Sequence, residues 1–129
     1  MKAFFTAIYS KFSTGTNDFK TATGGRLEYG RAPANWTDNF AVVQGISIDS
    51  EDVFRQSIND ISFQVTVFST TRDGCFDLND KCLALFDGAI LTVTGKTAIR
   101  VNREQQTPPI WNEQDRLYQA TTIFSCWVY

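Results

Sequence analysis

The apolar positions along this chain change their spacing several times, and each spacing predicts a type of secondary structure. In residues 2–13, KAFFTAIYSKFS, large apolar side chains recur every three or four positions, which predicts an amphipathic helix followed by a turn-rich loop at 13–18. In residues 60–70, DISFQVTVFST, apolar and polar side chains alternate, which is typical of a strand. Residues 70–88 return to helical spacing, and Gly88 is placed where a helix is expected to stop.

Shorter apolar runs predict the remaining strands. Leu27 and Tyr29 alternate with charged residues between glycines, and residues 40–49, FAVVQGISID, carry apolar side chains on both faces. Residues 90–104, ILTVTGKTAIRVNRE, contain two runs of β-branched residues, and residues 116–129 form a long terminal strand covered in part on both faces. The predicted order is α-β-β-β-α-β-β.

This order predicts an α+β fold. We expect residues 1–129 to form one domain, with a mainly antiparallel or mixed sheet of about five strands packed by two helices. A domain of this length buries roughly two-thirds of the surface that its unfolded chain exposes. Eleven Phe, four Tyr and three Trp supply the large side chains for such a core.

Charge and residue content narrow the classes of function. Twelve basic and fourteen acidic residues give a formal charge of −2, which argues against a surface that binds nucleic acid non-specifically. The absence of histidine removes the most common general base and metal ligand. The three cysteines, Cys75, Cys82 and Cys126, are too few and too widely spaced for a disulfide framework or a zinc site, so we expect buried thiols in a reducing cytosol. No catalytic residue, metal site or cofactor is predicted.

Two further patterns concern location and nucleotide binding. No signal peptide and no apolar run of about 20 residues is visible, so we expect a soluble protein that is made inside the cell and has no membrane partner. Thr94-Gly95-Lys96-Thr97 resembles the end of a P-loop, but Ile90 stands where the first glycine is required. A helix must also follow a P-loop, whereas the residues after Thr97 predict a strand. A tight turn explains Gly95 better.

Several segments, taken in order, carry a resemblance to a known family. They are MKAFFTAIYSKF, GGRLEYGRAP, FAVVQGIS, ISFQVTVFS, CLALFDGAILTVTGKTAIRV and the closing YQATTIFSCWVY. Together they resemble the tail-completion family of long-tailed bacteriophages, also called tail terminator or head–tail joining proteins. The resemblance covers nearly the whole chain and consists of apolar and turn patterns, with no catalytic signature.

The resemblance implies a structural role in the virion. Members form a ring, usually a hexamer, on the end of the tail tube, where they stop polymerisation of the tube protein and face the head-side connector. DNA passes through the ring without specific binding, which suits an acidic chain. Such a protein is located at the head-proximal end of the tail and in the host cytoplasm during assembly.

Long polar connections are the expected contact regions of a ring, because a cyclic assembly joins one patch to a different patch of the neighbour. Loop length and charge select residues 49–60 and 103–116. The candidate interface residues are Asp49, Glu51, Asp52 and Arg55 in the first segment, and Arg103, Glu104, Trp111 and Arg116 in the second. Trp111 follows two prolines, and it either anchors an interface or folds back onto its own domain.

Two other interpretations stay open at the level of sequence. One is another phage structural component of similar size, such as a tail tube subunit or a head-completion protein. The other is a small intracellular enzyme that uses Asp, Lys or Tyr side chains in a cleft, which would require a closely spaced buried carboxylate pair.

Overall fold

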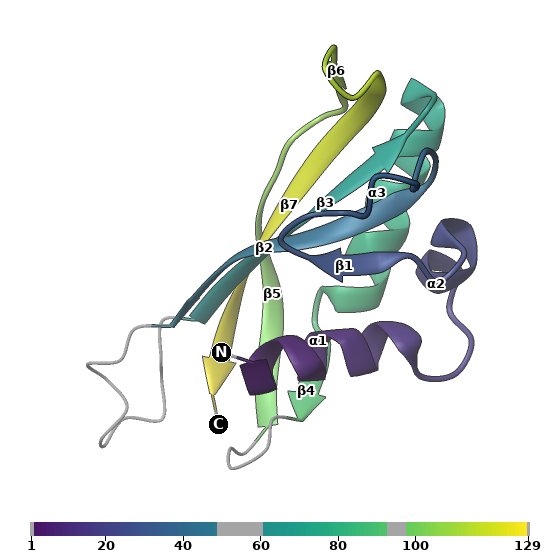
Figure 1. Ribbon diagram of the computed structural model, residues 1–129. Helices are drawn as coiled ribbons and strands as arrows, with labels where there is room; N and C mark the ends of the chain where they lie inside the picture. Colours follow the sequence, from purple (N-terminus) through teal and green to yellow (C-terminus); the bar gives the residue numbers. More distant parts are fainter. Residues whose placement is uncertain (1, 49–60, 93–97, 129) are drawn as a thin grey trace.

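The computed structural model describes residues 2–48, 61–92 and 98–128 of the chain. Three helices and seven strands follow one another along these residues (Figure 1). The elements are α1 (Lys2–Ser13), α2 (Asp18–Thr23), β1 (Leu27–Tyr29), β2 (Phe40–Ile48), β3 (Ile61–Ser69), α3 (Arg72–Phe86), β4 (Ile90–Thr92), β5 (Ala98–Gln106), β6 (Ile110–Asn112) and β7 (Leu117–Val128).

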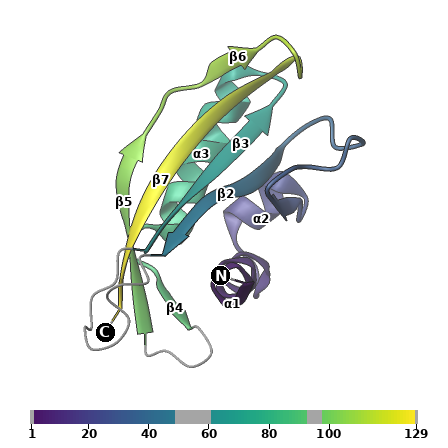
Figure 2. The ribbon, with the colours of Figure 1, turned by 60° about the vertical axis from the view of Figure 1, so that its left-hand side comes forward.

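All seven strands belong to one mixed sheet. The strand order is β1-β2-β3-β7-β5-β4, and β6 pairs with the first residues of β7. β1 and β2 are parallel, while every other pair is antiparallel. The sheet is strongly twisted, and the terminal strand β7 runs along its centre (Figure 2). The predicted α+β class is confirmed, with seven strands instead of about five.

Helices cover one face of this sheet and form the main core with it. The alternation predicted for residues 60–70 is confirmed in β3, since Ile61, Phe63, Val65 and Val67 are all buried. The ring of Phe63 lies 5.8 Å from that of Phe4 on α1 and 5.9 Å from that of Phe86 on α3, measured between centroids. The two predicted helices therefore pack against the predicted strand face.

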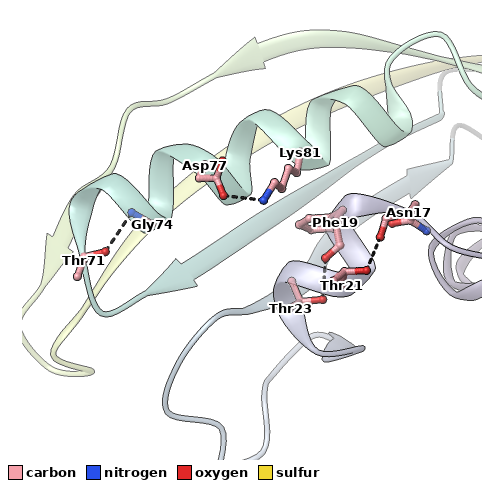
Figure 3. Close-up of polar contacts among 8 residues, drawn as sticks. All are labelled: Asn17, Phe19, Thr21, Thr23, Thr71, Gly74, Asp77 and Lys81. Carbon is pink, nitrogen blue, oxygen red and sulfur yellow. Dashed lines mark hydrogen bonds and ion pairs between the residues drawn. The ribbon is translucent and has the colours of Figure 1, made fainter.

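The prediction of only two helices was wrong, because α2 forms within the segment that was assigned no helix. Asn17 is its N-cap, and the Asn17 side chain accepts a hydrogen bond from the Lys20 amide at 2.7 Å. Gly24 ends the helix in the left-handed conformation, with φ of 64°. The buried Phe19 holds α2 against α3, with its ring centroid 6.5 Å from that of Phe86. Figure 3 shows α2 beside α3, with the Thr21 hydroxyl donating to the Asn17 carbonyl at 3.0 Å.

Helix α3 has one buried, apolar side and one exposed, polar side, as its helical spacing of apolar residues predicts. Thr71 is the N-cap, and its hydroxyl accepts a hydrogen bond from the Gly74 amide at 3.0 Å (Figure 3). Cys75 and Cys82 are on the buried side, whereas Asp77 forms an exposed ion pair with Lys81 at 2.8 Å. Asp73 and Asp80 are exposed as well, so the acidic residues of this helix lie toward solvent.

The prediction of a long loop at 103–116 was also wrong. Backbone pairing with β7 extends β5 as far as Gln106, and β6 adds a second short strand after Pro109. The tight turn predicted at Gly95 lies outside the described residues, but β4 and β5 on either side of it are antiparallel neighbours. Because Ala98–Gln106 is a strand, the helix that a P-loop requires does not follow Thr97.

Candidate interface on the helix-free face of the sheet

The face of the sheet opposite the helices is polar along much of its length. Gln44 and Gln64 are cross-strand partners, and the hydroxyls of Thr66 and Thr121 lie 3.0 Å apart across β3 and β7. At one end of the sheet this face is apolar, because Phe40, Val42 and Leu117 form a second apolar cluster there with Phe68. The sheet therefore has one apolar end on a face that no described helix covers.

A groove of about 550 Å³ lies over this apolar end. Its floor includes Phe40 and Phe68, whose rings stack at 4.7 Å with an angle of 16° between planes. One wall is the segment 30–37 between β1 and β2, and the other is the turn 114–116 before β7. The groove thus joins three parts of the chain that are distant in sequence.

Specific hydrogen bonds hold the first wall in place. The Arg26 guanidinium donates to the carbonyls of Asp38 and Asn39 at 2.8 and 3.1 Å. The Asp38 carboxylate accepts from both the amide and the hydroxyl of Thr70, each at 3.2 Å. Trp36 packs its ring 5.8 Å from that of Phe40. These contacts position the wall over the apolar floor without a regular element.

The second wall is a tight turn built by Asn112. The Asn112 side-chain oxygen accepts hydrogen bonds from the amides of Gln114 and Asp115 at 3.0 and 3.1 Å. Arg116 then adopts φ of 58°, and its amide donates to the Asn112 carbonyl at 2.7 Å. The left-handed conformation at Arg116 turns the chain directly into β7.

Of the four predicted interface residues that the structure describes, Arg116 lines this groove, whereas Arg103, Glu104 and Trp111 are not among its lining residues. Arg103 and Glu104 are exposed on β5, where a β-bulge lies between Arg103 and Gln105. The Arg103 amide donates to the Asp87 carboxylate at 2.9 Å, which ties the strand to the end of α3. The other four, Asp49, Glu51, Asp52 and Arg55, lie outside the described residues.

Trp111 folds back onto its own sheet, which is one of the two alternatives that the sequence left open. Its ring packs edge-on against Tyr118 of β7 with centroids 5.0 Å apart, and its indole N–H donates to Glu113 at 2.6 Å. The side chain nevertheless remains 43% exposed. Trp111 is therefore held against its own sheet while it presents a fixed aromatic surface to solvent.

The groove itself was not found from the sequence. No role was predicted for Ala32, Pro33 or Trp36, yet they form part of the groove wall. The available signal was the run of small and aromatic residues, RAPANW, which is less polar than an ordinary connection. Leu117, which lines the same groove, is 81 positions away from Trp36 in the sequence, so folding is needed to bring both to one site.

The buried groups of the described residues have the chemistry of a structural core. Burial raises the pKa of the Cys75 thiol to about 11 and that of Cys126 to about 12 from an ordinary value of 9.0, and it also raises the pKa of Cys82. These thiols stay protonated at neutral pH and are weak nucleophiles and ligands. Nowhere in residues 2–48, 61–92 and 98–128 do three Cys, Asp or Glu side chains cluster as a metal site requires. No described helix is long and apolar enough to cross a membrane.

Comparison with known proteins places the fold. No protein-family model and no curated protein sequence matches the chain. Among solved structures, a chain from the virion of a native gene transfer agent particle superposes with a TM-score of 0.76. The match covers 95% of this chain and 92% of that one, at 10% sequence identity. The two chains share a fold. The shared fold therefore extends over nearly the whole length of both chains.

Proposed function

We propose that this protein is a structural component of a bacteriophage-type virion. The observation that carries the proposal is the shared fold with a chain of a gene transfer agent virion over 95% of the present sequence. The resemblance of the ordered sequence segments to phage tail-completion proteins points to the same class. Two independent lines, sequence organisation and fold, therefore agree on a virion role.

The specific role we propose is that of tail terminator. In this role, residues 1–129 act as a single domain, and several copies, six by the family resemblance, form a ring on the tail tube. The ring ends polymerisation of the tube protein and provides the surface for the head-side connector. The net charge of −2 supports passage of DNA through the ring without tight binding. The protein would then be located at the head-proximal end of the tail, after assembly in the host cytoplasm.

This role requires surfaces for association and no catalytic centre. We retain Arg103, Glu104, Trp111 and Arg116 as proposed contact residues, because the first three lie exposed on strand edges and the last on the groove. Asp49, Glu51, Asp52 and Arg55 are proposed contacts on sequence grounds alone. Exposed strand edges favour this arrangement, since a neighbouring subunit would protect them from uncontrolled pairing.

The test is a measurement of mass by light scattering, first on the chain alone and then with headless tails and tailless heads. A monomer or closed ring that binds tail ends and restores infectious joining is the expected result. Growth into open tubes would identify a tube subunit instead. A chain that binds neither particle and restores no joining would overturn the virion proposal.

Charge reversals test the proposed contact residues separately. Arg103→Glu and Glu104→Arg are expected to lower joining activity, while Lys11→Glu on α1 serves as the matched reversal away from these strands. Equal joining by all three variants would remove Arg103 and Glu104 from the interface and leave the virion role untouched.

A further inference from the structure

We propose that the groove on the helix-free face receives α3 of a second copy of this chain. Phe76 is the side chain that enters the groove. The carboxylates of Asp73 and Asp80 pair with the guanidinium groups of Arg31 and Arg116 on its rim. This inference rests on the proposed function, because a ring requires a contact between two different patches of the same chain.

The outer surface of α3 carries an exposed aromatic side chain flanked by carboxylates. Phe76 is 47% exposed although it lies in the middle of a well-formed helix. Asp73 precedes it by three residues and Asp80 follows it by four, so all three side chains lie on one side of the helix. Asp77 is already paired with Lys81 at 2.8 Å, whereas Asp73 and Asp80 form no ion pair within the described residues. The stripe formed by Asp73, Phe76 and Asp80 on α3 therefore presents one aromatic ring between two carboxylates without an ion pair among the described residues.

The groove has the complementary chemistry. Its aromatic floor, with Phe40 stacked on Phe68, suits the edge or face of another aromatic ring. Arg31 and Arg116 both line the groove, and neither forms an ion pair within the described part of the chain. Asp115 is the acidic residue of the same lining, and its carboxylate is bound by the Asn112 amide at 3.2 Å. The rim therefore carries two unpaired cations beside an aromatic floor.

The two patches are placed so that copies can follow one another. Phe68 and Thr70 line the groove, and α3 begins at Arg72, two residues later, on the other face of the sheet. The stripe and the groove are thus back to back at the same end of β3, and α3 runs along β3 and β7 (Figure 2). When the groove of one copy meets α3 of the next, successive copies are therefore not displaced from one another along the strand direction. A contact of this kind, repeated with a small rotation, closes into a ring.

Disulfide trapping between single-cysteine variants tests the contact directly. Asp77→Cys, a variant at an exposed residue of α3 that keeps Phe76, is mixed in equal amounts with Ala34→Cys, a variant at an exposed residue on the groove wall. The mixture is oxidised with diamide, both in solution and in the presence of headless tails. The natural thiols are buried, so the introduced ones react selectively. Tyr9→Cys, at an exposed aromatic on α1, replaces Asp77→Cys in the matched control mixture.

We expect at least tenfold more covalent heterodimer from the Asp77→Cys mixture than from the Tyr9→Cys mixture. Equal yields, or no heterodimer under either condition, would overturn the inference. If wild-type protein still joined heads to tails in that case, only the contact would be wrong. If wild-type protein also failed to bind tails, the proposed function would fail with it.

Charge exchange supplies a second, independent readout. Arg116→Asp is expected to weaken association at least tenfold, and the added substitution Asp80→Arg is expected to restore it. Aspartate is compatible with the left-handed backbone at position 116, so the single variant keeps its turn. Failure of every reversal at Asp73 or Asp80 to rescue a weakened Arg116→Asp variant would remove the ionic part of the contact.

Discussion

The hydroxyl of Thr122 donates a hydrogen bond to the side-chain oxygen of Asn79 at 2.8 Å, joining the centre of β7 to α3. Both residues are buried, with 0% and 4% of their surfaces exposed. The side-chain amide nitrogen of Gln106 lies 3.4 Å from the same hydroxyl, and the side-chain amide nitrogen of Asn79 lies 3.5 Å from the Thr107 carbonyl oxygen. This small polar network lies in an apolar layer, so it fixes the helix on the sheet at one position.

Thr122→Val is therefore expected to lower the free energy of unfolding by about 1–3 kcal/mol, because the Asn79 oxygen loses its donor while it stays buried. Urea denaturation of the purified chain measures the change. Thr122→Ser keeps the hydroxyl and is the matched control, with a smaller loss that reflects one methyl group. A Val variant as stable as wild type would show that the Asn79 oxygen finds another partner.

Spacing of apolar residues was sufficient to predict the elements that bury a continuous face. Ile61, Phe63 and Val65 alternate with polar residues, and the structure buries all three. The helix at 72–86 was equally clear, because its apolar residues return every three or four positions. These elements are long enough for local pattern to report the side that faces the core.

Short elements and non-local contacts could not be predicted from the spacing of apolar residues. The six residues of α2 are too few for a periodic pattern, and only the cap residues Asn17 and Gly24 indicate the helix. β6 follows two prolines and exists because β7 pairs with it, so the sequence suggested a loop. The groove is lined by both Trp36 and Leu117, and no pattern within one segment records that they share a site.

The cap of α2 yields a second prediction. Asn17→Ala is expected to destabilise the fold by about 0.5–2 kcal/mol, because the Lys20 amide loses its acceptor at 2.7 Å. Asn17→Asp keeps this acceptor but loses the amide that donates to the Phe12 carbonyl at 2.9 Å. Thermal unfolding of the three proteins separates the two bonds. Equal stability of wild type and Asn17→Ala would show that α2 needs no cap.

Trp111 provides a third prediction, in which packing and association are separated. Trp111→Ala is expected to cost about 0.5–1.5 kcal/mol, since its edge-on contact with Tyr118 is lost from a partly exposed site. Trp111→Phe keeps an aromatic ring there and should retain most of the stability. Urea denaturation reports the packing, and joining of heads to tails reports the interface. Unchanged joining by a folded Trp111→Ala variant would assign this residue to packing alone.

The buried thiols make stability depend on pH in the alkaline range. The folded protein holds the pKa of Cys75 at about 11, whereas the unfolded chain has the ordinary value of 9.0. Below pH 9 both states keep the proton, and the full stability is present. Between pH 9 and about 11 the unfolded state binds fewer protons than the folded state, so the free energy of unfolding falls as pH rises.

Urea denaturation at pH 8.0, 9.5 and 10.5 measures this decline, since these values span roughly the onset of thiol ionisation. We expect the free energy of unfolding to fall with pH in wild type and to fall less steeply in Cys75→Ala. The comparison concerns the slopes, because the Ala variant also loses packing at every pH and other groups titrate equally in both proteins. A thiol reagent at pH 8.0 supplies the control, roughly one unit below that onset: native protein should react only as fast as it unfolds. Equal slopes in the two proteins would mean that the thiol of Cys75 is accessible to water and that α3 packs less tightly on β3 than the structure indicates. Immediate reaction of native wild type, but not of native Cys75→Ala, would mean the same.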